Sequence, residues 1–155
     1  MQRAIARTVA CGLFFVVTFV WAGAARAQLS IGTWVKQGAT PGQPGLSLVV
    51  EACCGGSGRK LIYKAGETVV LTVESALDGT DAPEISMGKP TGETMGIKRI
   101  DDHHTMTVLK LNGQQFGTST ATLSDDGKTL TVENNVTASL GGHKVGTTTE
   151  TWVRK

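Results

Sequence analysis

The stretch that decides the fold runs from residue 94 to residue 154 and reads TMGIKRIDDHHTMTVLKLNGQQFGTSTATLSDDGKTLTVENNVTASLGGHKVGTTTETWVR. Segments rich in Thr, Val, Ile and Leu, which suit a pleated and half-buried surface, alternate in it with short polar turns. The Asn112-Gly113 pair is the strongest hairpin signal of the chain. Five consecutive strands are therefore predicted, at residues 94–100, 105–111, 115–123, 128–137 and 144–154.

The N-terminal half adds four predicted strands, at residues 31–36, 46–51, 60–64 and 67–74, and residues 81–92 suggest a longer loop or a short extra strand. A meander of eight to ten strands in so short a chain leaves two open edges, and closure removes them. The sequence therefore predicts an all-β fold, an antiparallel up-and-down meander closed into an eight- to ten-stranded barrel. A two-sheet sandwich is the alternative, although sandwiches usually need Greek-key crossings.

The alternation within the strands indicates what faces the interior. Over residues 117–123 the Thr side chains share one face, and Gly, Ser, Ala and Leu share the other. In the next strand, Leu130 and Val132 share the expected inner face. Small inner residues leave either a cavity or a close approach of opposite walls. A barrel of this size can be filled by side chains or hold one small ligand, and both alternatives stay open.

Residues 1–27 have the three parts of a secretory signal peptide: a basic start, an apolar middle and a small-x-small end at Ala25-Arg26-Ala27. An N-terminal membrane anchor is the alternative. Cleavage after Ala27 leaves residues 28–155, enough for a single barrel domain with no integral membrane segment. We therefore expect a periplasmic or secreted protein.

The positive net charge belongs to this leader. Of the 15 Lys and Arg residues, the leader holds Arg3, Arg7 and Arg26 and no acid, so the remaining chain carries 12 bases against 13 acids, a net charge of −1. That balance gives no support to a nucleic-acid partner. The oligomeric state is not predictable from these residues.

Gly32-Thr33-Trp34 begins the first strand of the mature chain, and Arg154 ends the last, beside Trp152. This placement resembles the lipocalin and calycin superfamily, in which such a Trp and Arg pack together and close one end of the barrel. Trp34 and Arg154 are therefore the expected structural pair, through guanidinium–indole stacking, with Trp152 as the alternative platform.

The mature chain also resembles a group of small secreted bacterial proteins of unassigned function. The matching stretches are residues 32–34, 41–44, 97–101, 124–132 and 150–152. The resemblance implies a lipocalin-like β-barrel and a compartment outside the cytoplasm, and it implies no catalytic residue. The long C-terminal helix of lipocalins has no counterpart in this sequence.

Cys53 and Cys54 are adjacent, and the mature chain holds no other cysteine. Neighbouring Cα atoms lie about 3.8 Å apart across a trans peptide, below the usual disulfide span of about 4.4–6.8 Å. The following Gly55-Gly56-Ser57-Gly58 gives the backbone room to distort. Three readings stay open: a vicinal disulfide, a reduced or intermolecularly paired couple, and a redox or soft-metal site.

Asp101-Asp102-His103-His104 is a weak candidate for a metal site, with Asp101 and His103 on one face of an extended segment. A solvated turn is the alternative, because Asp side chains bond their own backbone in tight corners. No metal and no cofactor is predicted.

The chain contains no known catalytic motif, so we expect a protein that is not an enzyme. The leading hypothesis is a barrel that binds a small apolar ligand, whose lining residues the sequence does not identify. The alternative is a structural or interaction module of the cell envelope with no ligand cavity, which would use an outer face rich in Thr. A third hypothesis is a redox protein that uses Cys53 and Cys54.

Overall fold

The computed structural model describes residues 29–38, 42 and 44–155, and the predicted signal peptide lies outside these residues. Ten strands form in the described part of the chain, and each pairs antiparallel with its neighbours in sequence. The strands are β1 (Gly32–Lys36), β2 (Leu46–Cys53), β3 (Gly58–Ala65), β4 (Thr68–Ser75), β5 (Asp78–Ser86), β6 (Lys89–Arg99), β7 (His104–Leu111), β8 (Gln114–Leu123), β9 (Thr129–Val136) and β10 (Gly146–Arg154).

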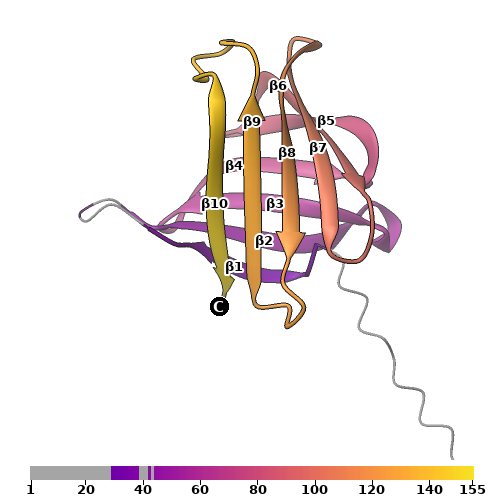
Figure 1. Ribbon diagram of the computed structural model, residues 1–155, viewed down its shortest axis with the longest axis vertical. Coiled ribbons are helices and arrows are strands. Elements are labelled where there is room, and N and C mark those ends of the chain that lie inside the picture. Colours follow the sequence, from indigo (N-terminus) through magenta and orange to yellow (C-terminus); the bar gives the residue numbers. More distant parts are fainter. Residues whose placement is uncertain (1–28, 39–41, 43) are drawn as a thin grey trace, which may run out of the picture.

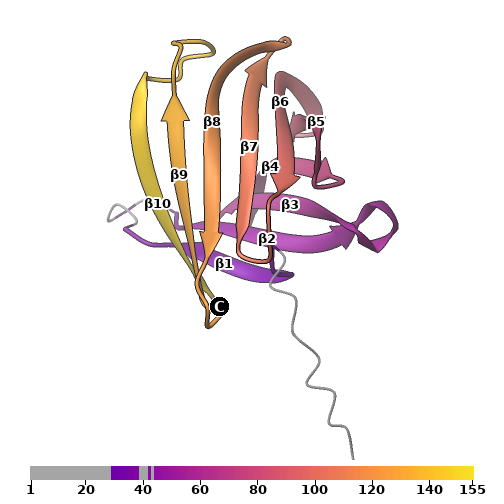
Figure 2. The ribbon, with the colours of Figure 1, turned by 45° about the vertical axis from the view of Figure 1, so that its right-hand side comes forward.

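The sheet closes on itself because β1 pairs with both β2 and β10. Figures 1 and 2 show β7 to β10 side by side on one side of the molecule, with β1 to β4 crossing them at a steep angle on the other. In the closing pair, Trp34 lies opposite Arg154 and Lys36 lies opposite Trp152. The predicted all-β meander, closed into a barrel, is therefore confirmed, and the fold is not a sandwich.

The predicted hairpin at Asn112-Gly113 joins β7 to β8. Both residues have positive φ, 48° and 82°, which is the backbone that a tight two-residue hairpin turn requires. Gly and Asn tolerate this conformation better than other residues do. The turn signal in the sequence therefore has a direct conformational cause.

The prediction of a longer loop or a short extra strand at residues 81–92 is wrong, because two longer strands cover this segment except for a two-residue turn. The segment belongs to a long hairpin of β5 and β6, and a turn at Met87-Gly88 joins the two strands. β5 is irregular. Its register with β6 shifts twice, and it pairs with β4 at only one register position, Thr72 with Ile85. Pro83, which has no N–H to donate, interrupts the ladder, so the periodicity that identifies a strand is broken here.

Apolar side chains from most of the barrel wall form one core. Its buried members are Trp34, Leu48, Val50, Leu61, Val73, Leu77, Ala82, Ile97, Leu123, Leu130 and Trp152. The expected inner face of β9 is confirmed, because Leu130 is buried in this core and Val132 packs against it. The one helical segment among the described residues is a turn at Cys54–Gly56, so none of them forms an apolar helix long enough to cross a bilayer.

Candidate functional site

A cavity of about 110 Å³ lies inside the barrel. Most of its wall is apolar, and the remainder carries hydroxyl, amide and carboxylate groups. The lining residues are Leu29, Leu48, Leu61, Tyr63, Met95, Ile97, Thr105, Thr107, Ser119, Ala121, Leu130, Val132, Asn134, Glu150 and Trp152. The small side chains of Ser119 and Ala121 leave part of this space open.

The wall changes from apolar to polar in one direction along several strands. Alternate residues of a strand face the same side, so each strand contributes a short inward series. The series are Leu130, Val132 and Asn134 on β9, Trp152 and Glu150 on β10, and Leu61 and Tyr63 on β3. We call the end of the cavity that holds Tyr63, Asn134 and Glu150 its polar end.

Two aromatic rings and an ion pair shape the polar end. Tyr63 meets Trp152 edge to face, with ring centroids 6.1 Å apart. The ammonium of Lys36 donates to Oε1 of Glu150 at 2.6 Å and lies 5.9 Å from the centroid of the Trp152 ring. The ammonium is therefore held by a carboxylate and by an aromatic face together.

The Tyr63 phenol is held neutral. Burial raises the pKa of Tyr63 to about 12, and the negative charges of Glu150 and Glu84 add to the effect. Both carboxylates are therefore near enough to act on a hydroxyl that lines the cavity. The phenol is a neutral hydrogen-bonding group of the polar end at any physiological pH.

Glu84 is a buried carboxylate on β5. Its side chain faces inward with Ala82, a member of the core, and the residue is only 7% exposed. No hydrogen bond or ion pair within the described residues reaches its carboxylate. Burial, then the negative charge of Glu93, raise the pKa of Glu84 to about 7, while His143 acts in the opposite direction. Burial removes part of the water around the carboxylate, which disfavours its charged form.

The loop between β9 and β10 contributes His143, which pairs with Glu93 and also affects the pKa of Glu84. His143 Nε2 lies 2.9 Å from Oε1 of Glu93 on β6. The imidazole also stacks on the buried ring of Phe116, with centroids 4.5 Å apart. Glu93, the acid whose charge raises the pKa of Glu84, is therefore paired with His143.

Trp34 and Arg154 lie together where β1 meets β10. The Arg154 guanidinium carbon is 5.6 Å from the centroid of the Trp34 ring, and Trp34 itself is almost fully buried. Arg154 also donates from Nη2 to the Ile31 carbonyl at 2.6 Å. Trp152, the alternative platform, has Lys36 rather than Arg154 over its ring.

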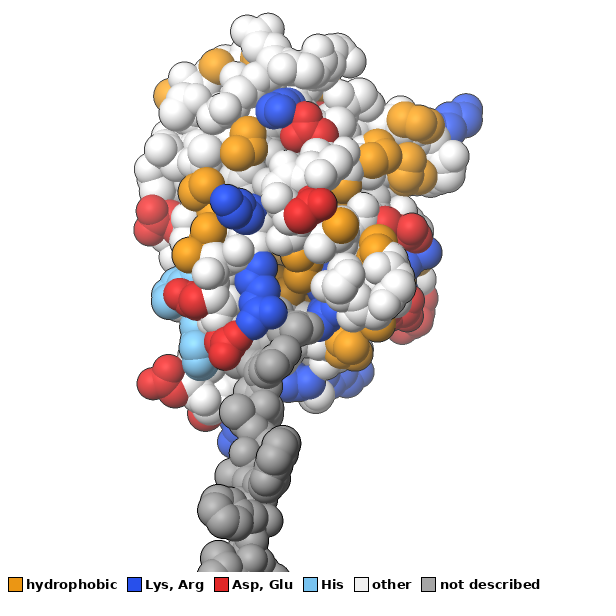
Figure 3. Space-filling view, turned by 90° about the vertical axis from the view of Figure 1, so that its right-hand side faces the viewer, with side chains coloured by type: hydrophobic (Ala, Val, Ile, Leu, Met, Phe, Trp, Pro, Cys, Tyr) orange, Lys and Arg blue, Asp and Glu red, His pale blue; other side chains and the backbone are white. Residues whose placement is uncertain are grey.

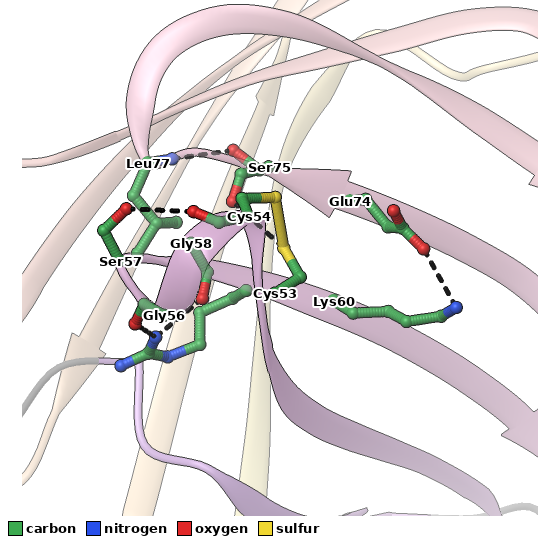
Figure 4. Close-up of a disulfide and its surroundings, with 10 residues drawn as sticks. Cys53, Cys54, Gly56, Ser57, Gly58, Lys60, Glu74, Ser75 and Leu77 are labelled. Carbon is green, nitrogen blue, oxygen red and sulfur yellow. Dashed lines mark hydrogen bonds and ion pairs between the residues drawn. A yellow bond between two sulfur atoms is a disulfide. The ribbon is translucent and has the colours of Figure 1, made fainter.

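A disulfide joins Cys53 and Cys54, whose Cα atoms are 3.8 Å apart (Figure 4). Cys54 has a left-handed backbone, with φ of 55°. The pair packs directly over Gly58, where a Cβ would lie 2.5 Å from the Ser75 carbonyl oxygen and 2.8 Å from Cys54 Cβ. Glycine at position 58 is therefore required for this packing.

The corner between β6 and β7 is built around Asp101. Its Oδ1 accepts hydrogen bonds from the backbone N–H groups of His103 at 2.7 Å and His104 at 2.8 Å. The hydrogen bond from the His103 backbone, then the one from the His104 ring, lower the pKa of Asp101. The His103 ring instead lies 3.0 Å from the Leu123 carbonyl oxygen, so Asp101 and His103 do not converge.

Of the residues that the structure describes, no three His, Cys, Asp or Glu side chains lie close enough to hold a metal ion. On the face shown in Figure 3, histidines lie beside acidic side chains, and basic and acidic groups are interspersed over the rest. This face presents no patch of a single charge sign.

Ser119 lies on the inner face that the alternation of β8 predicted, whereas the polar residues Tyr63, Asn134 and Glu150 were not predicted from the sequence. One signal was available for Lys36 and Glu150: each lies two residues from a strand tryptophan, Trp34 and Trp152, and so shares its face. Glu84 had no comparable signal, because its strand is too irregular for its inward direction to be read from the pattern.

The fold and the site define a closed antiparallel β-barrel with an internal, partly polar cavity. Comparison with known protein families finds none that matches the chain, and comparison with curated proteins finds no match either.

Proposed function

We propose that this protein is a binding protein, exported to the periplasm or beyond, that holds a small and mainly apolar molecule inside its barrel. The observation that supports the proposal is the internal cavity of about 110 Å³ with its largely apolar wall. Ligand pockets in proteins combine such a wall with a few polar groups that orient the ligand. The leader predicted at residues 1–27 supports the location.

The size of the cavity limits the ligand. An apolar cavity of about 150 Å³ accepts benzene, so a space of about 110 Å³ suits a molecule of a few carbon atoms, or one end of a longer molecule. The presence of this space favours ligand binding over an interaction module without a cavity.

Isobutanol is a suitable test probe because it is compact and mainly apolar. We expect its titration to shift the NMR signals of cavity methyl groups such as those of Leu61 and Val132. Ala121 lines the cavity, so Ala121→Leu fills space there and should abolish these shifts. Thr120 is the adjacent, exposed residue of β8, and Thr120→Leu is the matched control that should leave them intact.

Two results would contradict the proposal. One is the absence of any localised shift in the wild-type protein. The other is binding that survives Ala121→Leu unchanged, since the probe would then occupy another place.

A further inference from the structure

We propose that the molecule held in this barrel carries a neutral carboxamide head on a compact apolar body, and that Asn134 recognises this head. The inference rests on the proposed function and adds the chemical class of the ligand. It is carried by a row of polar side chains that the strand register places on the wall of the cavity.

Three polar residues form this row across three neighbouring strands. Thr107 on β7 lies opposite Ser119 on β8, and Ser119 lies opposite Asn134 on β9. All three residues line the cavity. Side chains directly opposite each other in antiparallel strands have Cβ atoms about 4.5–5.5 Å apart, so the three polar groups are neighbours on the wall. We call these three residues the polar row.

The polar row has hydrogen-bonding capacity that the protein does not use. None of its three side chains forms a hydrogen bond with another group in the described part of the chain. Thr94 Oγ1 is the one side-chain polar atom among the described residues that is fully buried without a partner. The polar atoms of the row are therefore accessible, and a ligand in the cavity that they line can bond to them.

Apolar side chains lie next to the polar row on the same wall. The next inward residues are Ala121 on β8 and Val132 on β9, which lie opposite each other. The inward residue beyond Val132 is Leu130, which is buried in the core. A ligand whose head bonds to Asn134 therefore places its apolar body against these side chains.

The charges of the wall favour a neutral head group. Of the lining residues that the structure describes, Glu150 alone carries a charge, and the ammonium of Lys36 neutralises it at 2.6 Å. Tyr63 is a neutral phenol, because burial raises its pKa to about 12. A charged head group would lose its water and meet no unpaired charge of the opposite sign on this wall.

The side chain of Asn134 distinguishes one neutral head group from another. Its carbonyl oxygen accepts hydrogen bonds and its NH2 group donates them. A ligand carboxamide carries the same two groups, so the two amides can form a pair of hydrogen bonds with each other. The Ser119 hydroxyl, which both donates and accepts, lies beside this pair. A ketone only accepts and would use half of this capacity.

The test compares three probes of the same shape: isobutyramide, isopropyl methyl ketone and isobutyrate. Binding to the whole protein is measured by NMR titration at about pH 7, where isobutyrate is charged. The additional hydrogen bond should make isobutyramide bind about fivefold or more tightly than the ketone. Isobutyrate should bind most weakly of the three, because Glu150 repels it and no cation on the wall is unpaired.

The variant Asn134→Leu keeps the approximate size of the side chain and removes its donor and acceptor. It should abolish the preference for isobutyramide over the ketone. Asn135 is the adjacent, exposed residue of β9, so Asn135→Leu is the matched control and should keep the preference. A second readout needs no variant: isobutyramide should shift the side-chain NH2 signals of Asn134 in the wild-type protein and leave those of Asn135 in place.

The outcomes separate the two proposals. If the ketone binds as tightly as isobutyramide, or isobutyrate binds best, the carboxamide class is wrong and the apolar cavity stands. If the preference survives Asn134→Leu, or the Asn134 signals do not move, the assignment to Asn134 is wrong. If isobutanol binds and isobutyramide does not, the carboxamide class alone fails, and if none of the four probes binds, the proposed function fails with it.

Discussion

Replacing Glu84 with glutamine should stabilise this protein at neutral and alkaline pH, although it removes a native side chain. Glu84 is buried, and its pKa is raised from 4.5 to about 7. A carboxyl group with a raised pKa in the folded state favours folding while it is protonated. That contribution is full below pH 4.5 and is lost as the pH rises toward 7.

The magnitude follows from the two pKa values. Each tenfold difference in proton affinity corresponds to about 1.4 kcal/mol, so a pKa raised from 4.5 to about 7 corresponds to about 3 kcal/mol. The glutamine variant does not ionise and avoids this loss. We therefore expect Glu84→Gln to match the wild type near pH 4 and to exceed its free energy of unfolding by about 3 kcal/mol above pH 8.

Urea denaturation of both proteins at a series of pH values measures this difference directly. Other titrating groups contribute equally to both proteins and cancel. Glu74→Gln, which alters an exposed ion pair, should change the unfolding free energy by less than about 1 kcal/mol. A Glu84→Gln difference that is the same at pH 4 and pH 8 would refute the reasoning, because it would mean that Glu84 is equally solvated in the folded and unfolded states.

Three further predictions concern the framework. Trp34→Ala should lower the free energy of unfolding by about 3–5 kcal/mol, and Arg154→Ala by only about 1 kcal/mol, because Trp34 is buried and Arg154 is exposed. Equal losses in thermal unfolding would contradict this. Cys53→Ser with Cys54→Ser should cost only about 1 kcal/mol, since the closed loop is so short. Thiol labelling before and after reduction checks that the wild-type bond is formed, and a loss of several kcal/mol would show a larger structural role. Gly58→Ala should destabilise by about 1–3 kcal/mol or more, because its Cβ would meet the Ser75 carbonyl oxygen, and unchanged urea unfolding would show that this contact relaxes freely.

Much of the fold was predictable because its signals are local. The strands from β7 to β10 alternate regularly, and Asn112-Gly113 adopts the backbone that its turn requires. Closure followed from the number of strands and from the need to protect sheet edges. These features depend on residues close together in the sequence, or on the count of similar segments, and both can be read without coordinates.

The candidate site was much less predictable because it combines distant residues with an irregular strand. Lys36 and Glu150 are brought together only by the register of β1 with β10. Glu84 follows Pro83 in a strand whose register shifts twice, so neither its burial nor its inward direction was evident. A glutamate in such a segment looks like an exposed loop residue until the strand is known.

The segment that the sequence failed to predict correctly, the irregular strand β5, is informative about function. Sequences usually agree with their folds at every level, and departures from that agreement concentrate at functional sites. Here the register of β5 with β6 shifts twice, more often than in any other strand pair of the described barrel, and β5 carries a buried carboxylate, Glu84. A core leucine or glutamine at position 84 would avoid the loss of stability that an ionised Glu84 imposes at neutral pH.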